Sequence, residues 1–114
     1  MRTVLLVDDD PVVLMLLSAL LSADGWRVSE AASLADAERA LRTAVPAVVV
    51  LDEQLPDGSG TALAARLAGL APRAHVVLHS GERRAVLPPG VHAVVPKGAT
   101  DALLDHLAAH EPAG

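Results

Sequence analysis

The chain has 114 residues, the size of one ordinary domain, and 52% of them are hydrophobic, which excludes disorder over most of its length. Its formal net charge of −5 and its single aromatic residue argue against a nucleic-acid partner, and the lack of cysteine excludes disulfides and thiolate chemistry. The longest apolar stretch, residues 12–17, is far shorter than the ~18 residues that a membrane-spanning helix needs, so we expect a cytoplasmic protein without membrane contact.

Apolar segments of strand length alternate along the chain with segments of helical periodicity. The expected strands cover residues 3–7, 26–31, 47–52, 74–79 and 91–95, and the expected helices cover residues 11–23, 34–44, 61–68 and 101–110. A segment over 82–87 has room for one or two helical turns before two prolines interrupt it. This alternation predicts an α/β fold with a parallel sheet of five strands and helices on both faces.

Polar residues mark the expected beginnings of three helices. Asp10, Ser33 and Thr100 each precede a helical segment and are expected to cap it with a side-chain oxygen. On the second helix, Glu38 and Arg42 are four residues apart, a spacing that favours an ion pair on the exposed side.

Five polar side chains follow the ends of four expected strands. Asp8 and Asp9 come after the first strand, Asp52 after the third, Ser80 after the fourth and Lys97 after the fifth. The carboxyl ends of parallel strands meet at one edge of the sheet, where open α/β proteins bind their ligands. We therefore expect these residues to form one site.

The chemistry of these groups favours a metal ion and a phosphoryl group. Two carboxylates ~4 Å apart repel by about 4 kcal/mol at an effective dielectric of ~20, and a divalent cation removes that conflict. Oxygen ligands without sulfur suit Mg²⁺. A carboxylate nucleophile would yield an aspartyl phosphate, which the Lys97 ammonium and the Ser80 hydroxyl can bind.

Four short motifs together resemble the receiver domain of the two-component response regulator family along the whole chain. They are LLVDDDP at 5–11, VVLDEQLPDG at 49–58, LHSG at 78–81 and VVPK at 94–97. The resemblance implies a flavodoxin-like, three-layer (βα)5 fold with the strand order 2-1-3-4-5. Residues 1–110 would form the receiver domain and residues 111–114 a frayed tail. We expect no output domain after residue 114 and therefore a single-domain regulator.

The resemblance also implies a role for each residue of the expected site. Asp52 would be the phosphoacceptor. Asp8 and Asp9 would form the acidic pocket, with Asp9 as a direct Mg²⁺ ligand, and Asp52 and the backbone carbonyl of Gln54 would complete the ligand set. The family's strand order would place Asp9 beside Asp52.

Ser80 and Lys97 would bind the phosphoryl group by the same resemblance. The donor would be a phosphohistidine on a sensor histidine kinase or a histidine phosphotransfer protein, and an unknown downstream protein would receive the signal. We expect a signalling module, not an enzyme, that acts by binding a partner or by relaying phosphate.

The chain departs from the family pattern in two places. Only 16 residues, 81–96, separate Ser80 from Lys97, and they contain two glycines and three prolines, so the fourth helix is expected to be short or absent. Val94 occupies the position of the family's switch aromatic residue. The usual coupling of hydroxyl and aromatic ring cannot operate, and we expect the output to use either the 81–90 loop or the apolar first helix.

Two other functions stay open. An Asp-x-Asp pattern over residues 8–10 resembles haloacid-dehalogenase-type phosphohydrolases, in which Asp8 would be the nucleophile. That family needs a further acidic pair after its fourth strand, and Glu82 alone follows here. The other alternative is a receiver-like interaction module that works without phosphorylation, which only the unusual fourth-helix region favours.

The histidines form no familiar metal motif. His106 and His110 are four residues apart on the last expected helix, but no Glu follows His106, so the zinc-protease pattern is incomplete. We therefore expect no zinc site. His79 adjoins the expected phosphoacceptor site and is a candidate for tuning it.

Overall fold

Five parallel strands form the central sheet in the computed structural model, which describes residues 2–81 and 86–110. The strands are Thr3–Val7 (β1), Arg27–Ala31 (β2), Val48–Asp52 (β3), His75–Ser80 (β6) and Ala93–Pro96 (β7), in the order β2-β1-β3-β6-β7. Since β6 and β7 are the fourth and fifth strands of this sheet, the predicted order 2-1-3-4-5 is confirmed. The predicted tail at 111–114 and part of the segment expected to form turns at 82–87 lie outside the described residues.

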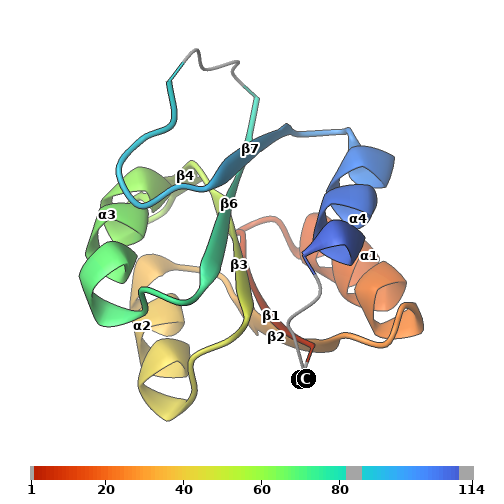
Figure 1. Cartoon of the computed structure of the whole chain (residues 1–114), viewed down its shortest axis with the longest axis horizontal. Helices are drawn as coiled ribbons and strands as arrows, with labels where there is room; N and C mark the ends of the chain where they lie inside the picture. Colours follow the sequence, from red (N-terminus) through yellow and green to blue (C-terminus); the bar gives the residue numbers. More distant parts are fainter. Residues whose placement is uncertain (1, 82–85, 111–114) are drawn as a thin grey trace.

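Helices cover both faces of the sheet, as predicted (Figure 1). Helices α1 (Pro11–Ala23) and α4 (Thr100–Ala109) cover one face, and α2 (Leu34–Thr43) and α3 (Gly60–Leu70) cover the other. A short antiparallel pair, Gln54–Leu55 (β4) and Gly58–Ser59 (β5), joins β3 to α3. No helix among residues 2–81 and 86–110 has both the length and the apolar character to cross a membrane.

Strand β3 is the most deeply buried part of the sheet. All five of its residues are buried. Val49 and Leu51 belong to the core beneath α2 and α3, and Val48 and Val50 belong to the core beneath α1 and α4. Burial on both faces of the sheet explains why the sequence of β3 is a continuous apolar run that ends at Asp52.

The described part of the connection from β6 to β7 is not helical. Its described residues, Gly81 and 86–92, contain no helix, in agreement with the prediction. Val91 is buried in the core on the α2 and α3 side, so the connection covers that part of the sheet. Gly90 makes the close approach possible, because its φ is +80° and a Cβ there would lie 1.9 Å from the Ala64 carbonyl oxygen.

Two of the three predicted helix caps are present. The Asp10 carboxylate accepts hydrogen bonds from the first turn of α1, and the Ser33 hydroxyl accepts one from the first turn of α2. The prediction for Thr100 is wrong: α4 has Ala99 at its cap position, and no side chain caps it. Thr100 lies inside the first turn instead, because the helix begins one residue earlier than the sequence indicated.

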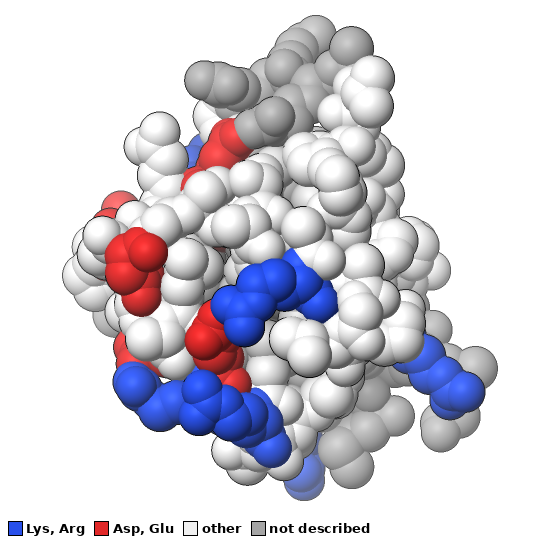
Figure 2. Space-filling model, turned by 90° about the vertical axis from the view of Figure 1, so that its left-hand side faces the viewer, with Lys and Arg blue, Asp and Glu red and all other residues white. Residues whose placement is uncertain are grey.

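The predicted pairing of Glu38 with Arg42 is also wrong. Glu38 pairs with Arg66 of the neighbouring helix α3. Helices α2 and α3 cover the same sheet face, so a tertiary partner replaces the local one. Basic and acidic side chains stand next to one another on this side of the molecule (Figure 2).

Helix α1 keeps an apolar surface exposed on its outer side. Leu14, Leu17 and Leu21 point into the core. In contrast, the side chains on the outer side are exposed by 63% at Val12, 67% at Met15 and 50% at Leu16. This surface, the apolar face of α1, begins directly after the loop that follows β1.

Asp57 ties the β4–β5 turn to the beginning of α2. Its carboxylate oxygens accept hydrogen bonds from the backbone N–H groups of Leu34 at 2.8 Å and Ala35 at 3.0 Å. Those N–H groups have no partner within the helix. The hydrogen bonds from Leu34 and Ala35 lower the pKa of Asp57 below its ordinary value.

We expect Asp57→Asn to lower the urea midpoint of unfolding at pH 7, because the amide is uncharged and has one acceptor oxygen for two N–H groups. A carboxyl group with a lowered pKa stabilises the fold above its unfolded value of 3.8 and loses that effect as the pH falls through the folded value. The difference between wild type and variant should therefore shrink below pH 3.8. Asp105→Asn, at an exposed position of α4, is the control. A pH-independent difference would contradict this role of Asp57.

Candidate phosphoacceptor site

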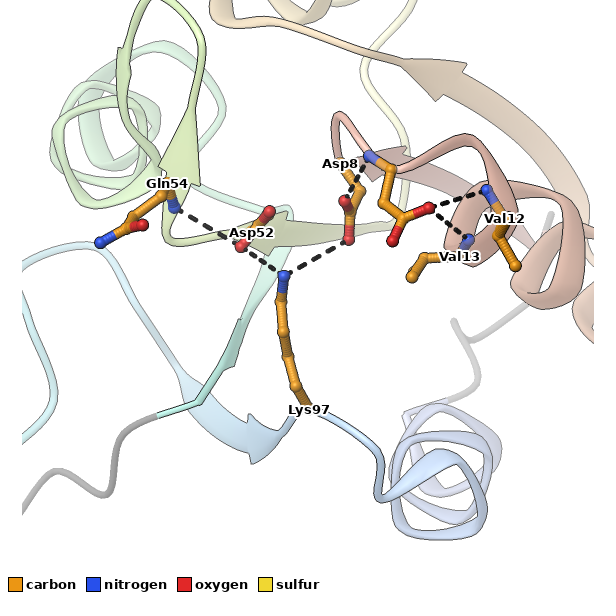
Figure 3. Close-up of polar contacts among 7 residues, drawn as sticks. Asp8, Val12, Val13, Asp52, Gln54 and Lys97 are labelled. Atoms are coloured by element: carbon orange, nitrogen blue, oxygen red, sulfur yellow. Dashed lines mark hydrogen bonds and ion pairs between the residues drawn. The ribbon is translucent and has the colours of Figure 1, made fainter.

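Three predicted carboxylates, Asp8, Asp9 and Asp52, lie together at the carboxyl edge of the sheet, and Figure 3 shows two of them, Asp8 and Asp52. Asp52 ends β3, and Asp8 directly follows β1, whose last residue pairs in register with Leu51. Their side-chain oxygens and those of Asp9 all lie within 4.8 Å of one another. Asp8 and Asp52 are 4% and 5% exposed, whereas Asp9 is exposed. The strand-end pattern predicted this proximity, and the roles of the three residues stay a prediction.

Lys97 reaches into this carboxylate group from the loop after β7 (Figure 3). Its Nζ lies 2.9 Å from Asp52 Oδ1 and 3.9 Å from Asp8 Oδ2. Burial disfavours the charge on Lys97, but the hydrogen bond to Asp52 and the neighbouring negative charges outweigh burial and raise the pKa of Lys97. Lys97 is therefore a fixed positive charge directly beside Asp52.

The pKa of Asp8 is raised above its ordinary value. Burial raises its pKa, and the charge of Asp52 adds to this effect, whereas a hydrogen bond from the Asp10 N–H at 2.9 Å and the charge of Lys97 oppose it. Three carboxylates against one ammonium group leave two negative charges uncompensated when all are ionised. The set of oxygen donors and its charge therefore fit a divalent cation such as Mg²⁺.

An open cavity of about 640 Å³ lies in front of Asp52. It is lined by Asp9, Asp52, Glu53, Gln54, Leu55, Pro56, Gly81 and Lys97. The Gln54 N–H lies 3.5 Å from Asp52 Oδ1. Gln54 thus lies at the expected place, and the metal-ligand role of its carbonyl stays a prediction.

Ser80 lies at the site but its hydroxyl has a partner that the sequence did not suggest. Ser80 ends β6 and is fully buried, and its hydroxyl donates a hydrogen bond to the Glu53 carboxylate. Glu53 looked like an ordinary turn residue in the sequence. Its one available signal was its position directly after Asp52, because that position places it at the same sheet edge.

His79 and Val94 complete the surroundings of the site. His79 pairs in register with Asp52 and is 6% exposed, and neither ring nitrogen has a hydrogen-bond partner in the part of the chain that the structure describes. Burial lowers the pKa of His79, helped by the charge of Lys97 and opposed by that of Asp52. Val94 in β7 lies opposite Leu78 of β6 and is only partly buried. An aliphatic side chain therefore occupies the position of the family's aromatic residue.

Residues 4–108 match the model of the response regulator receiver domain. The chain belongs to this family. This receiver is similar to the probable transcriptional regulatory protein TcrX of Mycobacterium tuberculosis, with 47% identity over 58 residues. That match covers 51% of this chain and 25% of TcrX. The receiver thus spans about a quarter of the length of this curated relative.

Two solved structures show the same fold. The response regulator TrrA of Thermotoga maritima, in complex with Mg²⁺-BeF, has a TM-score of 0.88 and 23% identity, and the match covers 97% of this chain and 100% of TrrA. A response regulator of Burkholderia pseudomallei, with a phosphorylated aspartic acid, calcium and citrate, has a TM-score of 0.85 and 23% identity. That match covers 94% of this chain and 66% of the other. At this level of identity the two structures establish the fold of the receiver.

Proposed function

We propose that this receiver accepts a phosphoryl group on Asp52 in two-component or phosphorelay signalling. The observation that carries the proposal is the position of Asp52, which is buried at the end of β3 with Lys97 Nζ at 2.9 Å and two further carboxylates nearby. Asp8, Asp9, Asp52 and the Gln54 carbonyl would hold Mg²⁺. The Mg²⁺-BeF complex of TrrA and the phosphorylated aspartic acid of the Burkholderia protein support this assignment.

In the proposed reaction, an Asp52 oxygen attacks the phosphorus of a phosphohistidine. The new O–P bond forms while the P–N bond breaks, and the imidazole leaves with that electron pair. A cation held by the carboxylates of Asp8, Asp9 and Asp52 would neutralise negative charge at the phosphoryl oxygens. Lys97 is already beside the reacting carboxylate and holds a positive charge for the product. Ser80 reaches a phosphoryl oxygen by exchanging its hydrogen bond to Glu53.

We propose that the donor is a sensor histidine kinase or a histidine phosphotransfer protein. The apolar face of α1 (Val12, Met15 and Leu16) starts next to the site, and its exposure supports it as the surface on which such a partner docks. Output would follow by binding a downstream protein or by relaying the phosphoryl group. The relative TcrX is named a probable transcriptional regulator, so the expectations of no nucleic-acid contact, a single domain and a cytoplasmic location remain predictions.

Removal of the metal tests the proposal. We expect incubation with Mg²⁺ and acetyl phosphate to add the mass of one phosphoryl group to the intact chain. An excess of EDTA should abolish this gain, because the carboxylate cluster then repels the incoming phosphate. The measurement is intact-mass spectrometry. No adduct in either sample would favour the interaction module that works without phosphorylation.

A further inference from the structure

Three histidines meet at the end of the sheet opposite to Asp52. His75 begins β6, His106 lies in the last turn of α4, and His110 is the C-cap residue of that helix. Strand β6 has six residues, so its first residue lies about 17 Å from its last, given a rise of about 3.3 Å per residue. These residues, the histidine cluster, are therefore separate from the phosphoacceptor site.

The imidazole rings of the cluster are in direct contact. His75 Nε2 lies 2.8 Å from His106 Nε2. The ring centroid of His110 is 3.8 Å from that of His75 and 4.5 Å from that of His106. One ring nitrogen from each histidine lies within 4.8 Å of the other two. Such a group of nitrogens at short range has the composition and spacing of a metal site.

Packing of α4 on the sheet explains this contact. Leu103 and Leu107 are fully buried against the face formed by alternate residues of the strands, including Val77. His75 lies two residues before Val77 and therefore points to the same face. His106 and His110 are four residues apart, so both stand on one side of the helix end. The hydrophobic packing thus fixes the backbones from which all three rings project.

We propose that His75, His106 and His110 bind a transition-metal ion of the Zn²⁺ class. Three imidazoles without a carboxylate favour Zn²⁺, Cu²⁺ or Ni²⁺ over Mg²⁺ and Ca²⁺. Three ligands leave a fourth tetrahedral position for water, which the exposure of His110 permits. The partial negative charge at the carboxyl end of α4 also favours a cation at this place.

The rings must turn from their present stacked arrangement to bind the ion. Tetrahedral Zn²⁺ with bonds of about 2.0–2.1 Å separates its ligand nitrogens by roughly 3.4 Å. The present separation of His75 and His106 nitrogens is 2.8 Å. A metal lies in the plane of each ring that binds it, so the stacked rings of His75 and His110 must tilt apart. Burial and the neighbouring histidines lower the pKa of His75 to about 4, which keeps its imidazole in the neutral form that metals bind.

His92 lies near the cluster but has a different role. Its ring centroid is 5.3 Å from that of His75, and its Nδ1 accepts a hydrogen bond from the Val76 N–H at 2.9 Å. That nitrogen is therefore occupied by the backbone. His92 forms a wall of the cluster and provides a matched control variant. The sequence indicated no zinc site because no Glu follows His106 and the zinc-protease pattern is incomplete. The third histidine of the cluster belongs to a strand 31 residues earlier.

Zn²⁺ titration of the full chain without an affinity tag tests the proposal. A chromogenic chelator reports competition for the metal, and saturating Mg²⁺ occupies the carboxylates around Asp52. We expect one tight Zn²⁺ site per chain in the wild type and in Asp52→Asn. His106→Gln and His110→Gln should each weaken Zn²⁺ binding by more than about tenfold, since even the loss of an outer partner of a ligand costs about 10–100-fold. His92→Gln should retain the wild-type affinity.

A second readout separates loss of a ligand from loss of the fold. Circular dichroism should show unchanged secondary structure in His110→Gln, because this residue is exposed at the helix end. Zn²⁺ should raise the melting temperature of the wild type and of His92→Gln, but not that of His110→Gln. Equal Zn²⁺ affinity in wild type and the folded His110→Gln variant would overturn the proposal. An equal loss in His92→Gln would overturn the assigned ligand set.

Discussion

Asp52→Asn is expected to abolish the gain of a phosphoryl group from acetyl phosphate. The rate of uptake should fall by more than about a thousandfold, because the amide is a far weaker nucleophile than the carboxylate. We propose Asp52 as the nucleophile, and not the equally buried Asp8, because the surroundings of the two carboxylates differ. Asp52 lines the open cavity and has Lys97 Nζ at 2.9 Å. Asp8 is not among the residues that line it and accepts the Asp10 N–H. Intact-mass spectrometry over a time course measures the effect.

Asp8→Asn is the matched control for this prediction. It removes one buried carboxylate from the same cluster but leaves Asp52 and its contact with Lys97 in place. We expect it to retain the adduct and to require a higher Mg²⁺ concentration for half-maximal uptake, because one negative charge of the metal site is lost. The opposite result, with uptake lost in Asp8→Asn and phosphate turned over by Asp52→Asn, would support the phosphohydrolase alternative.

The sequence predicted the sheet and the grouping of Asp8, Asp52 and Lys97 at one edge for the same physical reason. Burial on both faces makes β3 a continuous apolar run, and the first polar residue after such a run stands at the sheet edge. Asp8, Asp52 and Lys97 were found by this rule, without any knowledge of tertiary contacts. The short connection before Lys97 could be predicted as well, because prolines and glycines disfavour a helix locally.

The contacts that the sequence missed all depend on how two distant elements pack. Glu38 pairs with Arg66 because α2 and α3 lie on one face, and Ser80 bonds to Glu53 because β6 ends beside the loop after β3. The histidine cluster needs α4 to lie along β6. Local periodicity says which side of an element is buried, but it does not say which side chain of another element lies opposite.

A substitution at the close contact between β3 and α3 is also expected to have a large effect on stability. An ideal Cβ on Gly60 would lie 2.0 Å from the Asp52 carbonyl oxygen and 3.0 Å from its carbonyl carbon. The Gly60 N–H also donates to the Glu53 carbonyl at 2.9 Å. Gly60→Ala must therefore push the beginning of α3 away from the strand end that carries the phosphoacceptor. We expect a loss of about 2–3 kcal/mol in the free energy of unfolding, measured by urea denaturation, and slower phosphoryl uptake.

Gly69→Ala in the same helix shows whether the backbone contact, and not the added methyl group, is responsible. No atom lies within 4 Å of a Cβ at Gly69, and the residue is exposed. Alanine is the better helix former by about 0.5–1 kcal/mol, so this variant should be slightly more stable and should take up the phosphoryl group at the wild-type rate. Two identical substitutions in α3 are thus expected to change stability in opposite directions. If Gly60→Ala matched Gly69→Ala in both measurements, α3 would not be what holds Asp52 in position.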